Sequence, residues 1–164
     1  MMTDMSETGN RTTPNDAGLL AHAEARPDHI ALRLGDRALT YAELDDRARR
    51  ASHALAALGV RRGDRVAVMA PNSFEFFEAV HASGRLGAVV VPVNIHFKAD
   101  EAGWVVTDSG ATAVFVAEEL QPSLEGVPDV PRLVVGPAGD YEKALATARS
   151  KGPPSSASPR RTAL

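Results

Sequence analysis

The chain of 164 residues has no cysteine, and only three of its 18 basic residues are lysine, namely Lys98, Lys143 and Lys151. The absence of cysteine excludes disulfides, thiolate zinc sites and cysteine nucleophiles. The shortage of lysine limits phosphate chemistry, which often uses an ammonium group beside the phosphates. The formal net charge of −3 predicts no general attraction to nucleic acid or to an anionic membrane surface.

Long apolar runs are also missing from the sequence. The longest, GAVVVPV (87–93), is far shorter than the roughly 20 residues that a membrane-spanning helix needs. The first 16 residues, MMTDMSETGNRTTPND, lack the apolar core of a signal peptide. We therefore expect a soluble, cytoplasmic protein with no membrane span, in which the polar residues 1–14 are disordered.

The most clearly specified element is a helix that begins after Thr40. Thr40 and Glu43 have the spacing of a capping box, in which each side chain accepts a hydrogen bond from an exposed backbone N–H. Gly59 stands where a left-handed C-terminal cap belongs. One face of this helix is predicted to be apolar because five residues recur at steps of four and three: Leu44, Ala48, Ala51, Leu55 and Leu58.

The opposite face of this helix carries acid-before-base pairs four residues apart: Glu43/Arg47, Asp45/Arg49 and Asp46/Arg50. Such pairs stabilise an exposed helix face. Asp45 and Asp46 are therefore assigned to a solvated, charge-paired face and not to an acid–base couple.

The rest of the chain alternates apolar strands with helices. Two short strands around a Gly-Asp turn are predicted within 29–40. Pro71 ends one strand, Asn72 or Ser73 caps the helix after it, and Pro92 ends the next strand. Strands are expected at 65–70, 87–91, 110–118 and 131–136, and further helices at 16–25, from 74 onward, at 99–108 with Trp104 as its large apolar residue, and at 140–150. This alternation predicts an α/β fold with a mainly parallel sheet flanked by helices.

No chemical motif emerges from the residues themselves. The patterns G-x-G-x-x-G, G-x-x-x-x-G-K-[ST] and G-x-S-x-G are absent, and the five histidines show no metal-ligand spacing. His81 is interpreted as a hydrogen-bonded core residue, on a helix side shared with Phe74, Phe77 and Gly84. The cluster of Phe74, Phe76 and Phe77 is interpreted as core, with an acyl-chain pocket as the alternative. We assign no catalytic, cofactor-binding or metal-ligating residue.

Four segments in order nevertheless resemble the N-terminal part of the adenylate-forming (AMP-binding) enzymes, of the acyl-CoA ligase type. They are LTYAEL (39–44), GVRRGDRVAVMAPNS (59–73), RLGAVVVPVN (85–94) and DSGA (108–111). The resemblance extends from about Ala17 to Ala148. Within it, HFKADE (96–101) is similar to fatty acyl-CoA ligases, and an aryl acid is the alternative substrate.

The resemblance implies a reaction in two steps. A carboxylate attacks the α-phosphate of Mg-ATP to give an acyl-adenylate and pyrophosphate, and coenzyme A then attacks through its thiol. The full family uses ATP, Mg²⁺ and coenzyme A, held by a Ser/Thr/Gly-rich loop ending in lysine and by a C-terminal domain with a catalytic lysine. These motifs do not occur in the 164 residues, so we expect no cofactor bound by them alone.

The resemblance also divides the chain. Residues 15–150 are expected to form part of the N-terminal AMP-binding domain, in an incomplete fold. Residues 151–164, ending in SASPRRTAL, are expected to be the loop that leads to the strand before the phosphate loop. The resulting expectation is an inactive N-terminal fragment of an acyl-CoA ligase that associates through exposed apolar surface. The alternative is an interaction module that pairs with a separately encoded partner.

Overall fold

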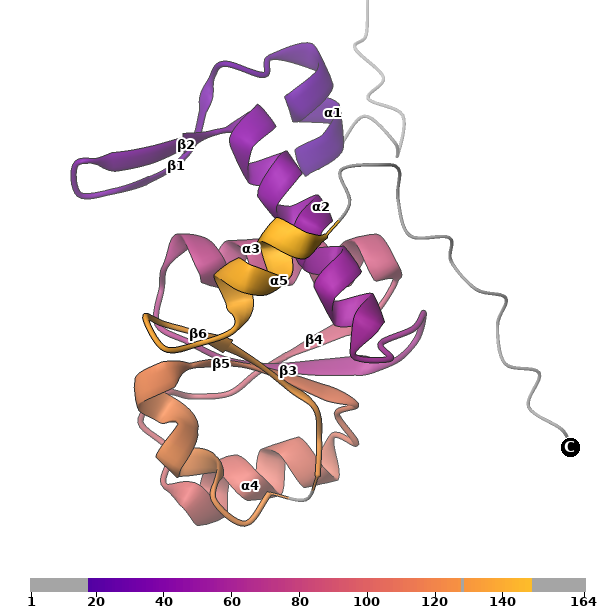
Figure 1. Cartoon of the computed structure of the whole chain (residues 1–164), viewed down its shortest axis with the longest axis vertical. Coiled ribbons are helices and arrows are strands. Elements are labelled where there is room, and N and C mark those ends of the chain that lie inside the picture. The colour runs from indigo at the N-terminus through magenta and orange to yellow at the C-terminus, as the bar shows by residue number, and fades with distance from the viewer. Residues whose placement is uncertain (1–17, 128, 149–164) are drawn as a thin grey trace, which may run out of the picture.

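A parallel sheet of four strands forms the centre of the computed structural model, which describes residues 18–127 and 129–148 (Figure 1). Its strand order is β4 (Val89–Pro92), β3 (Arg65–Met69), β5 (Ala113–Ala117) and β6 (Arg132–Val135). The three pairings are all parallel. The parallel sheet predicted from the alternating pattern is therefore confirmed.

Helices cover both faces of the sheet, giving three layers. On one face lie α2 (Tyr41–Ala57), α3 (Phe74–Leu86) and α5 (Tyr141–Thr147), and on the other lie α4 (Ala99–Asp108) and the 3₁₀ helix η1 (Glu118–Leu124) (Figure 1). Phe115 packs on the α2–α3–α5 side, and its neighbours Val114 and Val116 pack on the α4 side. All five residues of β5 are buried, as a strand covered on two faces requires.

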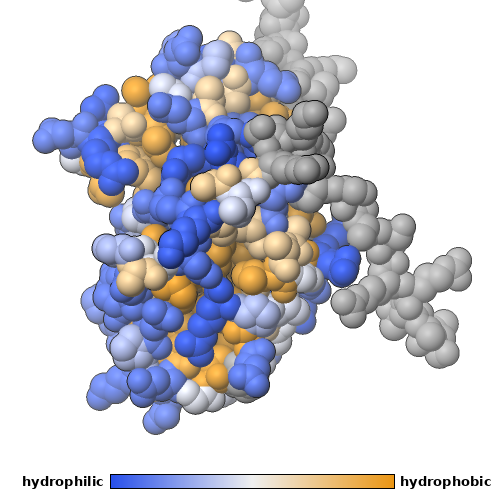
Figure 2. Space-filling model, viewed as in Figure 1, coloured by the Kyte–Doolittle hydropathy of each residue, from blue (hydrophilic) through white to orange (hydrophobic). Residues whose placement is uncertain are grey.

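A short helix and a hairpin extend from the body. Helix α1 (Leu19–Ala25) contacts α2, and β1 (Ile30–Leu34) pairs antiparallel with β2 (Arg37–Thr40). We call β1 and β2 the hairpin arm because they project away from the sheet in Figure 1. The hairpin prediction is confirmed. Figure 2 shows hydrophobic and hydrophilic residues side by side on the surface of this arm.

Helix α2 begins and ends as its sequence predicts. Thr40 Oγ1 accepts a hydrogen bond from Glu43 N at 3.2 Å, and Glu43 Oε2 accepts one from Thr40 N at 2.8 Å. Gly59 adopts a φ of 95°, in the left-handed region. Four of the five predicted apolar residues are buried, and the fifth, Leu58, is half-buried at the C-cap.

Other element boundaries agree with the predictions to within a few residues. Helix α4 has the predicted bounds, Ser73 rather than Asn72 caps α3, and Pro92 is the last residue of β4 instead of following it. Helix α1 begins at Leu19, and the helix η1 was not predicted. Residues 1–14 and 151–164, for which disorder and a loop were predicted, lie outside the described residues.

Both outer strands of the sheet have features that restrict further pairing. In β4 the N–H groups of Val89 and Val93 donate to the β3 side. The backbone N–H of Val90 therefore points away from β3, and Pro92 has no N–H to offer. In β6 the N–H of Val134 donates to Asp140 Oδ1 at 2.8 Å. Val89 is 54% exposed, so β4 is less covered than its apolar sequence suggests.

The capping box gives a first prediction. Thr40→Ala removes one acceptor for the orphan N–H groups of α2, and we expect a loss of about 1 kcal/mol in the free energy of unfolding, measured by urea denaturation. Thr107→Ala, at an exposed residue of α4, is the control and should change the free energy by less than about 0.5 kcal/mol. Equal losses in the two variants would contradict the role of the cap.

Candidate functional site

The carboxyl ends of the four strands meet at one edge of the sheet, where parallel α/β proteins commonly bind ligands. The chain leaves β3 toward α3 on one face and leaves β5 toward η1 on the other. The connections therefore diverge between β3 and β5, which is where a ligand site is expected in such a sheet.

Two polar side chains at this edge shape a helix cap and a turn. Ser73 Oγ accepts from Phe76 N at 3.2 Å, and Glu118 Oε2 accepts from Ala138 N at 3.0 Å. A Cβ at Gly136 would collide with the Glu118 side chain, so the turn after β6 needs glycine to approach this carboxylate. These contacts favour a structural role for the edge.

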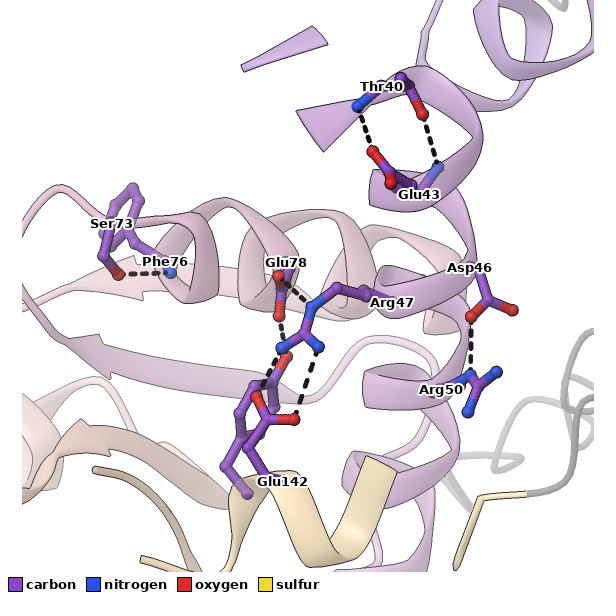
Figure 3. A network of polar contacts seen from close by, with 10 residues as sticks. Thr40, Glu43, Asp46, Arg47, Arg50, Ser73, Phe76, Glu78 and Glu142 are labelled. Carbon is purple, nitrogen blue, oxygen red and sulfur yellow. Dashed lines mark hydrogen bonds and ion pairs between the residues drawn. The ribbon is translucent and has the colours of Figure 1, made fainter. Parts of the chain in front are cut away.

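The densest polar cluster lies instead between three helices (Figure 3). Glu78 of α3 is fully buried and accepts from Arg47 Nε of α2 at 2.6 Å and from the Tyr141 hydroxyl of α5 at 2.5 Å. Arg47 also donates through Nη2 to Glu142 Oε1 at 2.6 Å. We call Arg47, Glu78, Tyr141 and Glu142 the three-helix network.

The charges in this network are set by burial and by one another. Burial alone would lower the pKa of Arg47, but its hydrogen bonds and charge attraction to Glu78 and Glu142 outweigh burial and raise it. Burial, and then the negative charge of Glu78, raises the pKa of Tyr141. Arg47 therefore stays charged and Tyr141 neutral, which leaves no group of these two ready to exchange a proton near neutral pH.

The structure corrects the predicted charge pairs on α2. Arg47 pairs with Glu78 and Glu142 rather than Glu43, and Asp45 pairs with Arg85 of α3 rather than Arg49. The side chains of Asp45 and Arg85 are each 18% exposed, so this part of α2 is not a solvated face. Only the Asp46/Arg50 pair forms as predicted, at 2.7 Å.

The predicted apolar side of α3 was also wrong. The buried residues include Phe74, Glu78, Ala82 and Leu86 at steps of four, whereas Phe77 is exposed. Glu78 was missed because a glutamate interrupts this row. Its position between two buried apolar residues one turn away on either side is the signal that could have found it.

His81 and the three phenylalanines of α3 differ in how deeply they are buried. His81 is half-buried, and desolvation followed by the charge of Arg85 lowers its pKa, against the smaller opposite effect of Asp45. Of the three phenylalanines, Phe74 is buried beneath the Arg37 guanidinium, 4.9 Å from the ring centroid. Phe76 is half-buried, and Phe77 is 38% exposed and meets Phe76 edge to face. The core interpretation holds for Phe74 but not for Phe77.

Metal ligands do not converge in the part of the chain that the structure describes: no group of three His, Asp or Glu side chains could hold an ion. Within the same ranges, no helix is long and apolar enough to cross a membrane. We therefore derive no step through Mg²⁺ from these residues.

The comparisons with known proteins identify the family. The sequence model of the AMP-binding enzymes matches residues 19–163. This chain belongs to that family. It is 38% identical over 122 residues to a feruloyl-CoA synthase of an Amycolatopsis species, covering 74% of this chain and 25% of the relative. It is 37% identical over 89 residues to the long-chain-fatty-acid–CoA ligase FadD13 of Mycobacterium tuberculosis, and the match covers 54% of this chain and 18% of the relative.

Members of the AMP-binding enzyme family with solved structures share the fold of this chain. The N-terminal domain of FACL13 from Mycobacterium tuberculosis superposes with a TM-score of 0.73 at 30% identity, covering 84% of this chain and 36% of that one. The resemblance predicted from the four sequence segments is thus confirmed. The chain spans about a quarter of the length of the feruloyl-CoA synthase that it matches.

The three-helix network gives the second prediction. Arg47→Met leaves the buried Glu78 without its cation, and we expect a loss of about 3 kcal/mol or more in the free energy of unfolding. The measurement is urea denaturation followed by circular dichroism. Arg50→Met, which breaks the exposed pair with Asp46, is the matched control and should cost less than about 1 kcal/mol. A loss at Arg47 no larger than that at Arg50 would contradict the network's role.

His81 gives a prediction for pH. Since its pKa in the folded chain lies below the ordinary 6.5, the unfolded chain takes up the proton first as the pH falls. Stability from this residue is therefore present above 6.5 and is lost below it. Relative to His81→Asn, the wild-type chain should lose stability between about pH 7.5 and about pH 5.5.

The measurement is chemical denaturation at a series of pH values. His96→Asn, at an exposed histidine, is the control and should keep the wild-type pH dependence. Parallel curves for the wild-type chain and His81→Asn would refute the assignment.

Proposed function

We propose that residues 18–148 form the scaffold of a ligase that activates a carboxylic acid with ATP and transfers the acyl group to coenzyme A in the cytoplasm. The observation that carries this proposal is the family match over residues 19–163, together with a fold shared with the FACL13 N-terminal domain. ATP, Mg²⁺ and coenzyme A are then needed by the whole ligase.

The proposal assigns the described residues to support rather than to chemistry. The buried charges link helices to one another, and the polar side chains named at the carboxyl edge accept from backbone N–H groups. The 164 residues contain no Ser/Thr/Gly-rich loop followed by lysine, the element that holds ATP phosphates with backbone N–H groups and a cation. We therefore infer that this chain does not form acyl-adenylate by itself.

A fatty acid is the proposed substrate, supported by the similarity of HFKADE (96–101) to fatty acyl-CoA ligases and by the relative FadD13. In the structure this segment begins α4, where Glu101 Oε2 accepts from Lys98 N at 3.0 Å. An aryl acid is the second candidate, favoured by the 38% identity to the feruloyl-CoA synthase.

The test grafts this chain into two recipients. Residues 19–148 replace the matching stretch of FadD13 in one protein and of the feruloyl-CoA synthase in the other, and pyrophosphate release is measured with dodecanoate or ferulate. We expect the FadD13 graft to keep kcat/KM within about tenfold of its parent, a change of about 1.4 kcal/mol, and the synthase graft to lose more. Under the same conditions the 164-residue chain alone should release no pyrophosphate.

Each part of the proposal can fail separately. Release by the isolated chain would refute the supporting role. Folded but inactive grafts, checked by cooperative melting, would refute the ligase scaffold. If the feruloyl-CoA synthase graft keeps a larger fraction of its parent's kcat/KM than the FadD13 graft does, an aryl acid is the better substrate assignment. If neither graft folds, grafts of residues 41–92 alone repeat the comparison.

A further inference from the structure

A hollow of about 230 Å³ lies between the hairpin arm and the beginning of α3. Its apolar wall consists of Leu32, Leu34, Phe74 and Phe77. Two of these side chains are unusually open for their size, since Leu34 is 51% and Phe77 38% exposed. Large apolar side chains gathered around one hollow are a common sign of a binding surface.

The one charged residue in the lining of this hollow is positive. Arg33 forms part of its wall, and no ion pair with another described residue engages this side chain. Arg37 adds a second guanidinium nearby, stacked on Phe74. The remaining polar wall comes from Asn72 and Ser73, so no carboxylate lines the hollow. An anionic group would therefore find a cation and hydrogen-bond donors in a lining that contains no carboxylate.

A second apolar hollow on the same chain offers a contrast. It lies along α4, has a volume of about 430 Å³, and is lined by Phe97, Trp104 and Val105. Its charged residues are Asp100 and Glu101, and Trp104 is 66% exposed. The two hollows are both apolar but carry opposite charge, so an amphipathic anion should distinguish between them.

We propose that the hollow between the hairpin arm and α3 binds amphipathic carboxylates, with the apolar chain against Leu34 and Phe77 and the carboxylate beside Arg33. At about 230 Å³ the hollow is smaller than the sites of drug-sized ligands, so it suits a short chain such as that of octanoate. The proposal adds a place at which this chain captures an acid. It is tested by binding alone and does not rest on ligase activity.

The experiment is a titration of the isotope-labelled full chain with octanoate, followed through its backbone amide NMR signals. We expect saturable shifts at residues 32–34 and 72–77 and none at 97–105. Affinity should rise by about two- to fourfold for each methylene from hexanoate to octanoate. Octanol should bind more weakly at the same residues, and octylammonium should not bind there.

Variants separate the charge from the apolar wall. Arg33→Gln should weaken octanoate binding by about two- to fivefold and leave octanol binding unchanged, whereas Arg33→Lys should retain most of the affinity. Phe77→Ala should lower the affinity for both octanoate and octanol. Trp104→Ala, in the acidic hollow, is the matched control and should change neither. The amide spectrum of each variant shows whether its fold is intact.

Several outcomes would overturn the proposal. They are the absence of saturable shifts up to the solubility limit of octanoate, equal binding of octylammonium, and shifts centred on residues 97–105. Shifts at the hairpin arm that follow protein concentration without octanoate would assign the hollow to a second copy of the chain instead.

Discussion

One guanidinium, that of Arg47, holds the helical layer on one side of the sheet together. It lies between a fully buried carboxylate on α3 and a solvent-facing one on α5. A buried charge without a partner is among the costliest features a fold can contain, so Glu78 and Arg47 each require the other. The Tyr141 hydroxyl completes the environment of Glu78, and its ring packs edge to face on Phe115 of the sheet. The position of α5 thus depends on Tyr141, which makes both a polar contact with Glu78 and an apolar contact with Phe115.

The same arrangement explains how the described residues of this member of the AMP-binding enzyme family are divided between support and surface. Charged side chains that a sequence pattern would place in water are used to connect helices, as Asp45 and Arg85 also show. Apolar side chains that the pattern would bury, such as Phe77, are left at the surface beside the hairpin arm. The described residues therefore form their strongest ion pairs between buried helix faces and leave apolar side chains exposed beside the hairpin arm.

What could be predicted from the sequence was mostly local. The Thr40–Glu43 cap, the bounds of α4 and the alternation of strands and helices depend on residues a few positions apart, and all three were found. The partners of Arg47 stand 31 and 95 residues away, beyond the reach of any spacing rule. On α3 two helical rows start at Phe74, and the row without glutamate looked more apolar. In the folded chain the buried row is the one that contains Glu78, because Arg47 and Tyr141 donate hydrogen bonds to its carboxylate there.

The two edge strands of the sheet, β4 and β6, affect how readily the chain pairs with other chains. A free strand edge recruits further strands through its unpaired N–H and C=O groups, and this is a common start of fibrous aggregation. Along β4 the backbone N–H of Val90 points away from β3 and Pro92 has no N–H, and along β6 the N–H of Val134 donates to the Asp140 carboxylate. Among the described residues each edge of the sheet thus lacks a regular row of free N–H donors, which makes pairing with a further strand less favourable.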